Sequence, residues 1–221
     1  MKSTRKAILI LAAFLLLAFS AAQADVIVLV TSPIGGDTVD WSTIGLPVGT
    51  QLHAFVGFSV GGDTATVSVA NPTSNKGRII QQGNNWNGDF SPNEWGIWTQ
   101  NHGPLAVSFG NSYNMIGAFF QPDILGSFTV KLQAFNGGTL LGTVTESGTS
   151  TTNPGTALFI GALDKTGPNI TKVVFSEVST TNPNDFAIAT MYLGTPEPGT
   201  MVLLGTGLLA VMGLSRRFHR K

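Results

Sequence analysis

The sequence contains no cysteine among its 221 residues. This absence excludes disulfide bonds, thiolate metal sites and cysteine nucleophiles together. Charged residues are also scarce, at 11% of the chain. A folded domain must therefore depend on its hydrophobic core, and a segment of about 170 residues is long enough to bury one.

Basic residues are nearly missing from the middle of the chain. Seven of the 12 Lys and Arg residues lie before residue 25 or after residue 194, whereas Glu197 is the single acidic residue in those two ends. Residues 25–194 therefore hold 5 basic and 11 acidic side chains, a formal charge of −6. A segment with this balance and no basic cluster is a poor binder of polyanions, which argues against nucleic acid as a partner.

The N-terminus has the layout of a secretory signal peptide. Three basic residues precede an apolar run at 8–19, and Ala22-Gln23-Ala24 follows with the small-x-small pattern that signal peptidase reads. We predict that residues 1–24 are a signal peptide, cleaved after Ala24 by signal peptidase. The alternative is a retained membrane anchor, for which the apolar run is short.

The C-terminus has three parts in a fixed order. Pro196-Glu197-Pro198 comes first, an apolar stretch at 201–214 follows, and the basic tail 216–221 ends the chain. We predict a transmembrane helix at about 199–215, with the tail on the cytoplasmic side and the body outside. An ordinary tail anchor with a proline-rich stalk is the alternative.

This C-terminal order of parts, over residues 195–221, resembles the PEP-CTERM sorting signal. The resemblance implies that an exosortase processes the protein at Pro196, Glu197 and Pro198. It also implies a Gram-negative host that secretes polysaccharide, an exported protein that is anchored transiently in the membrane, and a final place at the cell surface or outside the cell.

The middle of the chain reads as short β-strands separated by turns. Runs rich in Val, Ile, Phe and Thr alternate with Gly, Pro, Asn and Asp clusters, and no long helical periodicity is present. These features predict an all-β, two-sheet sandwich over residues 25–194, of the jelly-roll type. The expected strands are 26–31, 53–60, 65–70, 77–82, 105–109, 115–121, 126–135, 140–145, 156–162, 170–178 and 185–192.

The body is also similar to a group of exported PEP-CTERM β-sandwich proteins of unknown activity. The segments that carry this similarity form the fold and hold little chemistry; they are 37–42, 86–90, 104–126, 157–161, 169–173 and 185–188. The similarity therefore supports the architecture and is silent on activity.

Three of the four tryptophans lie in one polar segment, residues 84–102. Tryptophan rings stack on sugars while nearby polar groups bond to hydroxyls, so Trp86, Asp89, Trp95 and Trp98 are candidate glycan contacts of a lectin-like module. The alternative is that these tryptophans are half-buried plugs at the edge of the sandwich.

The same segment offers a weak calcium pattern. Asn85, Asn87 and Asp89 alternate around Gly88, and Ca²⁺ takes oxygen ligands of these types. Only one of the three is a carboxylate. Other oxygen donors that a jelly roll could bring together are Asp37, Asp40, Asp123 and Asp185, although related sequences carry an acidic or amide residue after the position of Ile188, where this chain has alanine. No other cofactor is predicted.

Asp89 and Glu94 form the one acidic pair that a glycan hydrolase could use. Two acids in a polar loop are more often solvated, and we expect a protein that is not an enzyme. The expected function is that of a structural or adhesive protein, exported and associated with extracellular polysaccharide or the biofilm matrix.

Overall fold

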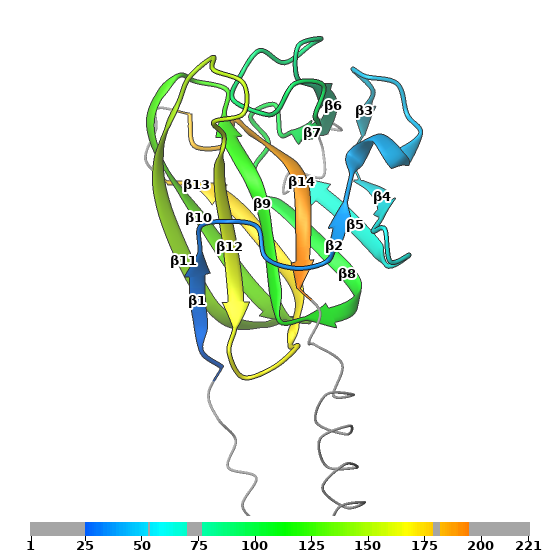
Figure 1. The fold of residues 1–221 in the computed structure, drawn as a ribbon, viewed down its shortest axis with the longest axis vertical. Helices are drawn as coiled ribbons and strands as arrows, with labels where there is room; N and C mark the ends of the chain where they lie inside the picture. The colour runs from blue at the N-terminus through cyan, green and yellow to red at the C-terminus, as the bar shows by residue number, and fades with distance from the viewer. Residues whose placement is uncertain (1–24, 53, 70–76, 179–181, 195–221) are drawn as a thin grey trace, which may run out of the picture.

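The computed structural model describes residues 25–52, 54–69, 77–178 and 182–194. Their regular structure is β-strand apart from one short 3-10 helix, η1 (Trp41–Ile44). The strands form two antiparallel sheets that pack face to face (Figure 1). The predicted all-β, two-sheet sandwich is confirmed.

The first sheet has eight strands. They are β1 (Ile27–Val30), β2 (Asp37–Val39), β3 (Gln51–Leu52), β6 (Gly77–Gln81), β7 (Trp95–Trp98), β9 (Met115–Pro122), β12 (Leu158–Asp164) and β14 (Phe186–Gly194). Their order across the sheet is β1-β12-β9-β14-β7-β6-β3, and β2 pairs with β14 at one side of this path.

The second sheet has six strands. They are β4 (Ala54–Phe58), β5 (Thr64–Val69), β8 (Leu105–Tyr113), β10 (Gly126–Asn136), β11 (Thr139–Ser150) and β13 (Ile170–Glu177). Their order is β11-β10-β13-β8-β5-β4. After the β10–β11 hairpin, strands β12, β13 and β14 lie alternately in the two sheets, a crossing pattern typical of a jelly roll.

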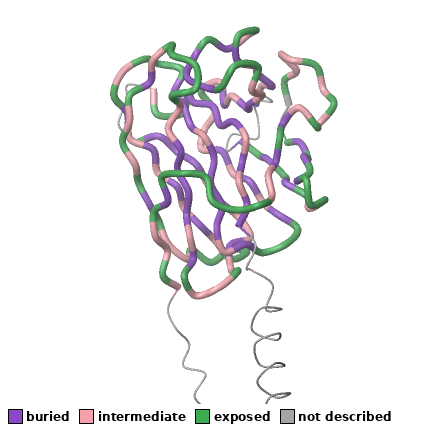
Figure 2. The backbone as a smooth tube through the Cα atoms, viewed as in Figure 1, coloured by how far each residue is buried: buried purple, intermediate pink, exposed green. Residues whose placement is uncertain are grey.

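The core lies between the sheets, where Figure 2 shows the buried segments of the strands. Strand β10 shows how the sequence produces it, because its apolar side chains recur at every second residue. Phe128, Val130, Leu132 and Ala134 are all buried, as the alternation predicts. Strand β14 is buried on both faces because it lies between β9 and β7 in the middle of its sheet.

The strands predicted from sequence all correspond to observed strands, with shifts at their ends. Three short strands were not predicted: β2, β3 and β7. Strand β7 lies inside the polar tryptophan segment, where no alternation indicates it. Strand β11 extends to Ser150, beyond the predicted end at 145, because it pairs with β10 along nearly its whole length.

Both ends of the described body lie at the same end of the sandwich (Figure 1). The backbone N–H of Asn114 donates to the carbonyl of Gly194, and the N–H of Asp164 donates to the carbonyl of Asn114. Asp164 in turn pairs with Ile27 on β1. A continuous set of backbone contacts thus connects the start of the body to its end, and the opposite end of the sandwich carries the loops at 82–94 and 151–157.

The predicted processing sites lie outside the described residues. These are Ala22 and Ala24 in the signal peptide, the motif Pro196-Glu197-Pro198, the transmembrane helix at 199–215 and the tail 216–221. Within the ranges that the structure describes, no helix has the length and apolar character needed to cross a membrane.

Candidate functional site

The tryptophan segment folds over the outer face of the eight-stranded sheet as a second, smaller core. Trp86 and Phe90 stack with ring centroids 6.1 Å apart, and they pack with Ala187 and Ala189 of β14. Trp86 is 6% exposed. The structure therefore favours the interpretation of Trp86 as a plug that buries the outer face of β14, since its ring presents no free surface to a sugar.

Gln121 at the end of β9 holds this segment in place. Its side-chain carbonyl accepts hydrogen bonds from the indole N–H of Trp86 at 2.9 Å and from the backbone N–H of Asp89 at 2.8 Å. Its amide donates to Ser150 Oγ at 3.0 Å and to the carbonyl of Thr151. One buried glutamine thus joins the loop at 82–94 to the end of β11.

Asp89 is also buried and hydrogen-bonded within the fold. It is 2% exposed, and its carboxylate accepts hydrogen bonds from the N–H and hydroxyl of Thr151 and from the N–H of Asn153. Glu94 has different partners: its carboxylate accepts hydrogen bonds from the backbone N–H groups of Ser91 and Thr190. Both candidate acids are therefore engaged in holding loops to strands.

Trp95 and Trp98 are half-buried and differ in their surroundings. Trp95 packs against the main core, whereas the indole N–H of Trp98 donates to Asp185 Oδ1 at 2.6 Å. Asp185 is buried, and its backbone carbonyl accepts from the N–H of Asp123. Burial, followed by the nearby Asp185 charge, raises the pKa of Asp123 above its ordinary value of 3.8.

The structure places the three predicted calcium ligands in different surroundings. Asn85 Oδ1 accepts from the N–H of Gln81 at 2.8 Å, Asn87 is exposed, and the Asp89 oxygens face Thr151. Among the described residues there is no group of three or more His, Cys, Asp or Glu side chains that could hold a metal ion. Calcium binding at Asn85, Asn87 and Asp89 stays a prediction.

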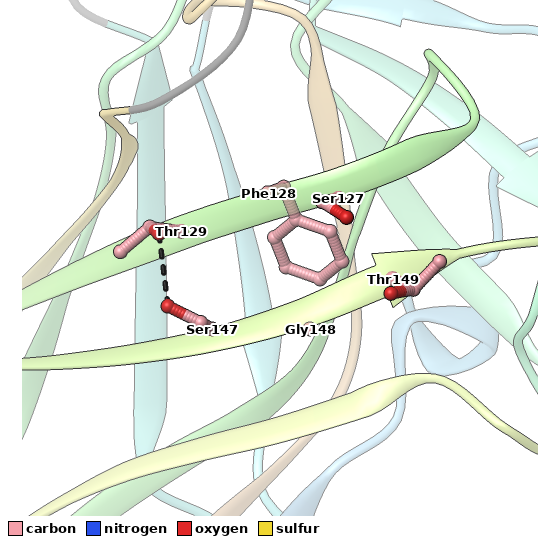
Figure 3. A pocket seen from close by; sticks show the side chains of 6 residues that line it. All are labelled: Ser127, Phe128, Thr129, Ser147, Gly148 and Thr149. Atoms are coloured by element: carbon pink, nitrogen blue, oxygen red, sulfur yellow. Dashed lines mark hydrogen bonds between the residues drawn. The ribbon is translucent and has the colours of Figure 1, made fainter.

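A hollow of about 440 Å³ lies on the outer side of the β10–β11 hairpin. Its lining consists of Ser127, Phe128, Thr129, Ser147, Gly148 and Thr149 (Figure 3). Thr129 and Ser147 point toward one another from the two strands, and their hydroxyl oxygens lie 2.9 Å apart. Four of the six lining residues thus carry a hydroxyl group.

The hollow is one part of a longer polar row on the same face of the hairpin. Alternate residues of the two strands form four cross-strand pairs, which we call the hydroxyl ladder: Ser127 with Thr149, Thr129 with Ser147, Lys131 with Thr145, and Gln133 with Thr143. The residues between them, such as Phe128 and Val130, are buried in the core. The register of the hairpin therefore places every polar side chain of the ladder on the outer face.

Gly148 shapes this region from the strand opposite Phe128. A Cβ at this position would lie 3.1 Å from the Phe128 ring, so the absence of a side chain lets the ring pack across the strand. The ladder was not predicted from the sequence. The sequence pattern that could have indicated it is the recurrence of Thr or Ser at every second residue, at 143, 145, 147 and 149.

Residues 195–217 match the family model of the PEP-CTERM protein-sorting motif. The chain carries a PEP-CTERM sorting signal. This signal starts one residue after β14 ends at Gly194. A PEP-CTERM protein is exported, is sorted through the membrane and has an exosortase as its processing partner, as the order of parts at the C-terminus predicts.

No curated protein matches the PEP-CTERM chain in sequence. Solved structures that resemble it include a glycoside hydrolase family 43 arabinoxylan arabinofuranohydrolase from Bacillus subtilis (18% identity, TM-score 0.33, 54% of this chain and 25% of that one). A peptidoglycan O-acetylesterase has 15% identity and a TM-score of 0.32, over 66% of this chain and 34% of that one. The chain thus spans a quarter to a third of the length of these two proteins.

A third similar structure is the family 11 carbohydrate-binding module of a cellulosomal cellulase from Clostridium thermocellum. It has 10% identity and a TM-score of 0.28, over 75% of this chain and 99% of the module. With TM-scores this low, no role of the three proteins is transferred to the PEP-CTERM chain.

Proposed function

We propose that this PEP-CTERM protein is a structural or adhesive component of the extracellular matrix, and that its β-sandwich associates with extracellular polysaccharide without cleaving it. The sorting signal accounts for export and for processing by an exosortase. Association with polysaccharide is what the body itself contributes.

The observation that carries the proposal is the place of the hydroxyl-lined hollow. Gly194 pairs with Met115 at one end of β9, whereas Pro122 at the other end of β9 leads through a short turn into the hollow at Ser127. The hollow therefore lies toward the end of the sandwich opposite to the chain ends. A body tethered through its C-terminal signal would hold this surface away from the membrane.

The environment of the two candidate acids supports a non-catalytic role. A retaining or inverting glycosidase needs two carboxyl groups that face one cleft. Here the Asp89 carboxylate is buried against Thr151, and that of Glu94 is held by Ser91 and Thr190. Each acid thus stabilises the fold at its own place.

The test is incubation of the full chain, in detergent, with polysaccharide isolated from the bacterium that produces it. We expect the protein to sediment with the polysaccharide and to release no reducing ends. Failure to co-sediment would overturn the proposal. Release of reducing ends that disappears in Asp89→Asn or Glu94→Gln would replace it with a glycan hydrolase.

A further inference from the structure

We infer that the hydroxyl ladder is the polysaccharide-binding surface of this protein, and that its ligand is a neutral polysaccharide chain lying along β10 and β11. This inference rests on the proposed function and assigns it a site and a ligand class. The observations behind it are the register, the charge and the rigidity of the hairpin.

The register gives the ladder the shape of an extended site. Successive pairs on one face of a strand are separated by two residues, so its four pairs span roughly 20 Å along the hairpin. The hollow at Thr129 and Ser147 is one part of this length. A surface of this form fits several units of a linear chain better than a single small molecule.

The chemistry of the ladder matches a polyhydroxylated ligand. A Ser or Thr hydroxyl both donates and accepts hydrogen bonds, as sugar hydroxyls do, and water can bridge the remaining gaps. Six of its eight side chains carry a hydroxyl. The proton of a hydroxyl group can rotate about its C–O bond, so these six groups can adapt their hydrogen bonds to a sugar chain.

The net charge of the body favours a neutral polysaccharide as the ligand. Lys131 is the one ionised side chain on the ladder, and the surrounding body has a formal charge of −6. An acidic polysaccharide would approach a body whose net charge has its own sign, and would gain a single cationic contact at Lys131. A neutral chain meets no such repulsion.

The ladder is rigid but has no aromatic ring for a sugar to stack on. Phe128 is 4% exposed and belongs to the core, so hydrogen bonds would provide most of the contacts. The hairpin pairs over 11 residue positions, which holds the hydroxyls in a fixed arrangement and reduces the entropy lost on binding. Affinity at one site is expected to be weak, and many copies on one cell surface would add to it through multivalency.

The experiment compares three full-length proteins in detergent: the wild type, the double variant Thr129→Val with Ser147→Ala, and the control Thr66→Val with Ser68→Ala. The control removes the same two kinds of hydroxyl from exposed positions of β5, on the outer face of the same sheet. Each protein is sedimented with the producing bacterium's polysaccharide, separated by anion exchange into a neutral and an acidic fraction. Melting temperatures establish that the variants are folded.

We expect the wild type and the control to sediment with the neutral fraction, and the ladder variant to bind it about tenfold more weakly. Equal binding by the ladder variant would overturn the ladder as the site and leave the proposed function standing. Binding to the acidic fraction alone would overturn the neutral ligand class. Binding to neither fraction would overturn the proposed function and the inference together.

Discussion

The indole N–H of Trp86 donates to the side-chain carbonyl of Gln121 across 2.9 Å, and both residues are buried. This bond joins the tryptophan segment to the end of β9, where the same carbonyl also accepts from Asp89 N–H. The segment that carries the most aromatic surface in the sequence is therefore part of the fold.

Replacing Gln121 with Leu should lower the free energy of unfolding by about 2–4 kcal/mol, because the buried donors at Trp86 and Asp89 lose their acceptor. Urea denaturation measures the loss. The matched control is Gln133→Leu on the outer face of β10, where a surface substitution is expected to change stability by less than about 0.5 kcal/mol. Equal effects of the two variants would contradict the role of Gln121.

Trp86→Phe separates structural from sugar-binding roles of the tryptophan segment. The smaller ring still packs near Phe90 but cannot donate to Gln121, so we expect a loss of about 1–2 kcal/mol in stability. Polysaccharide binding by the folded variant should equal that of the wild type. Loss of binding at unchanged stability would restore Trp86 as a glycan contact.

The pair of Asp123 and Asp185 predicts a pH effect. Burial and the Asp185 charge raise the pKa of Asp123 in the folded protein, so the folded state binds a proton more readily than the unfolded state. Its contribution to stability is therefore largest at acidic pH and falls as the pH rises from 3.8 through the raised pKa. Asp123→Asn should remove this decline and raise the melting temperature at neutral pH.

Asp40→Ala tests an acidic residue whose carboxylate is expected to stabilise the fold, in contrast to Asp123. The Asp40 carboxylate caps η1 by accepting from the N–H of Ser42 at 2.9 Å. Its removal should lower stability by about 1 kcal/mol at neutral pH. A lower melting temperature in Asp123→Asn as well would show that Asp123 and Asp185 do not repel each other.

The two tyrosines should ionise only at strongly alkaline pH. Burial, with the hydrogen bond that Tyr113 donates to Asp63 at 2.7 Å, raises the pKa of Tyr113, and burial raises the pKa of Tyr192. Stability from these groups is present below the ordinary tyrosine value of 10.0 and is lost as the pH rises through the folded values. Phenolate absorbance should therefore rise together with unfolding. Phenolate formation near 10.0 in folded protein would contradict these environments.

The main strands could be predicted from sequence because their signals are local. Strand β10 alternates apolar and polar residues, and Asn136-Gly137-Gly138 supplies the turn, where Gly137 has a φ of 55°. Strand β7 could not be predicted, because Trp95–Trp98 is defined by its pairing with β6 and β14. Pairing between distant segments leaves no periodic trace in so short a strand.

The candidate sites depend even more on long-range contacts. The residue types around Asp89 suggested a ligand, but its partners Thr151 and Asn153 lie 62 and 64 residues away. Predicting the ladder would have required a different fact, namely that β11 continues past residue 145 in register with β10. Neither fact can be obtained from the composition of one segment.

The most direct measurement is made on the producing bacterium. An epitope placed in the 25–194 body allows the protein to be followed through inner membrane, cell surface and polysaccharide matrix fractions, with mass spectrometry of its ends. We expect a product in the matrix fraction that has lost the tail at 216–221. An intact tail on protein that stays in the inner membrane, with none in the matrix, would contradict it.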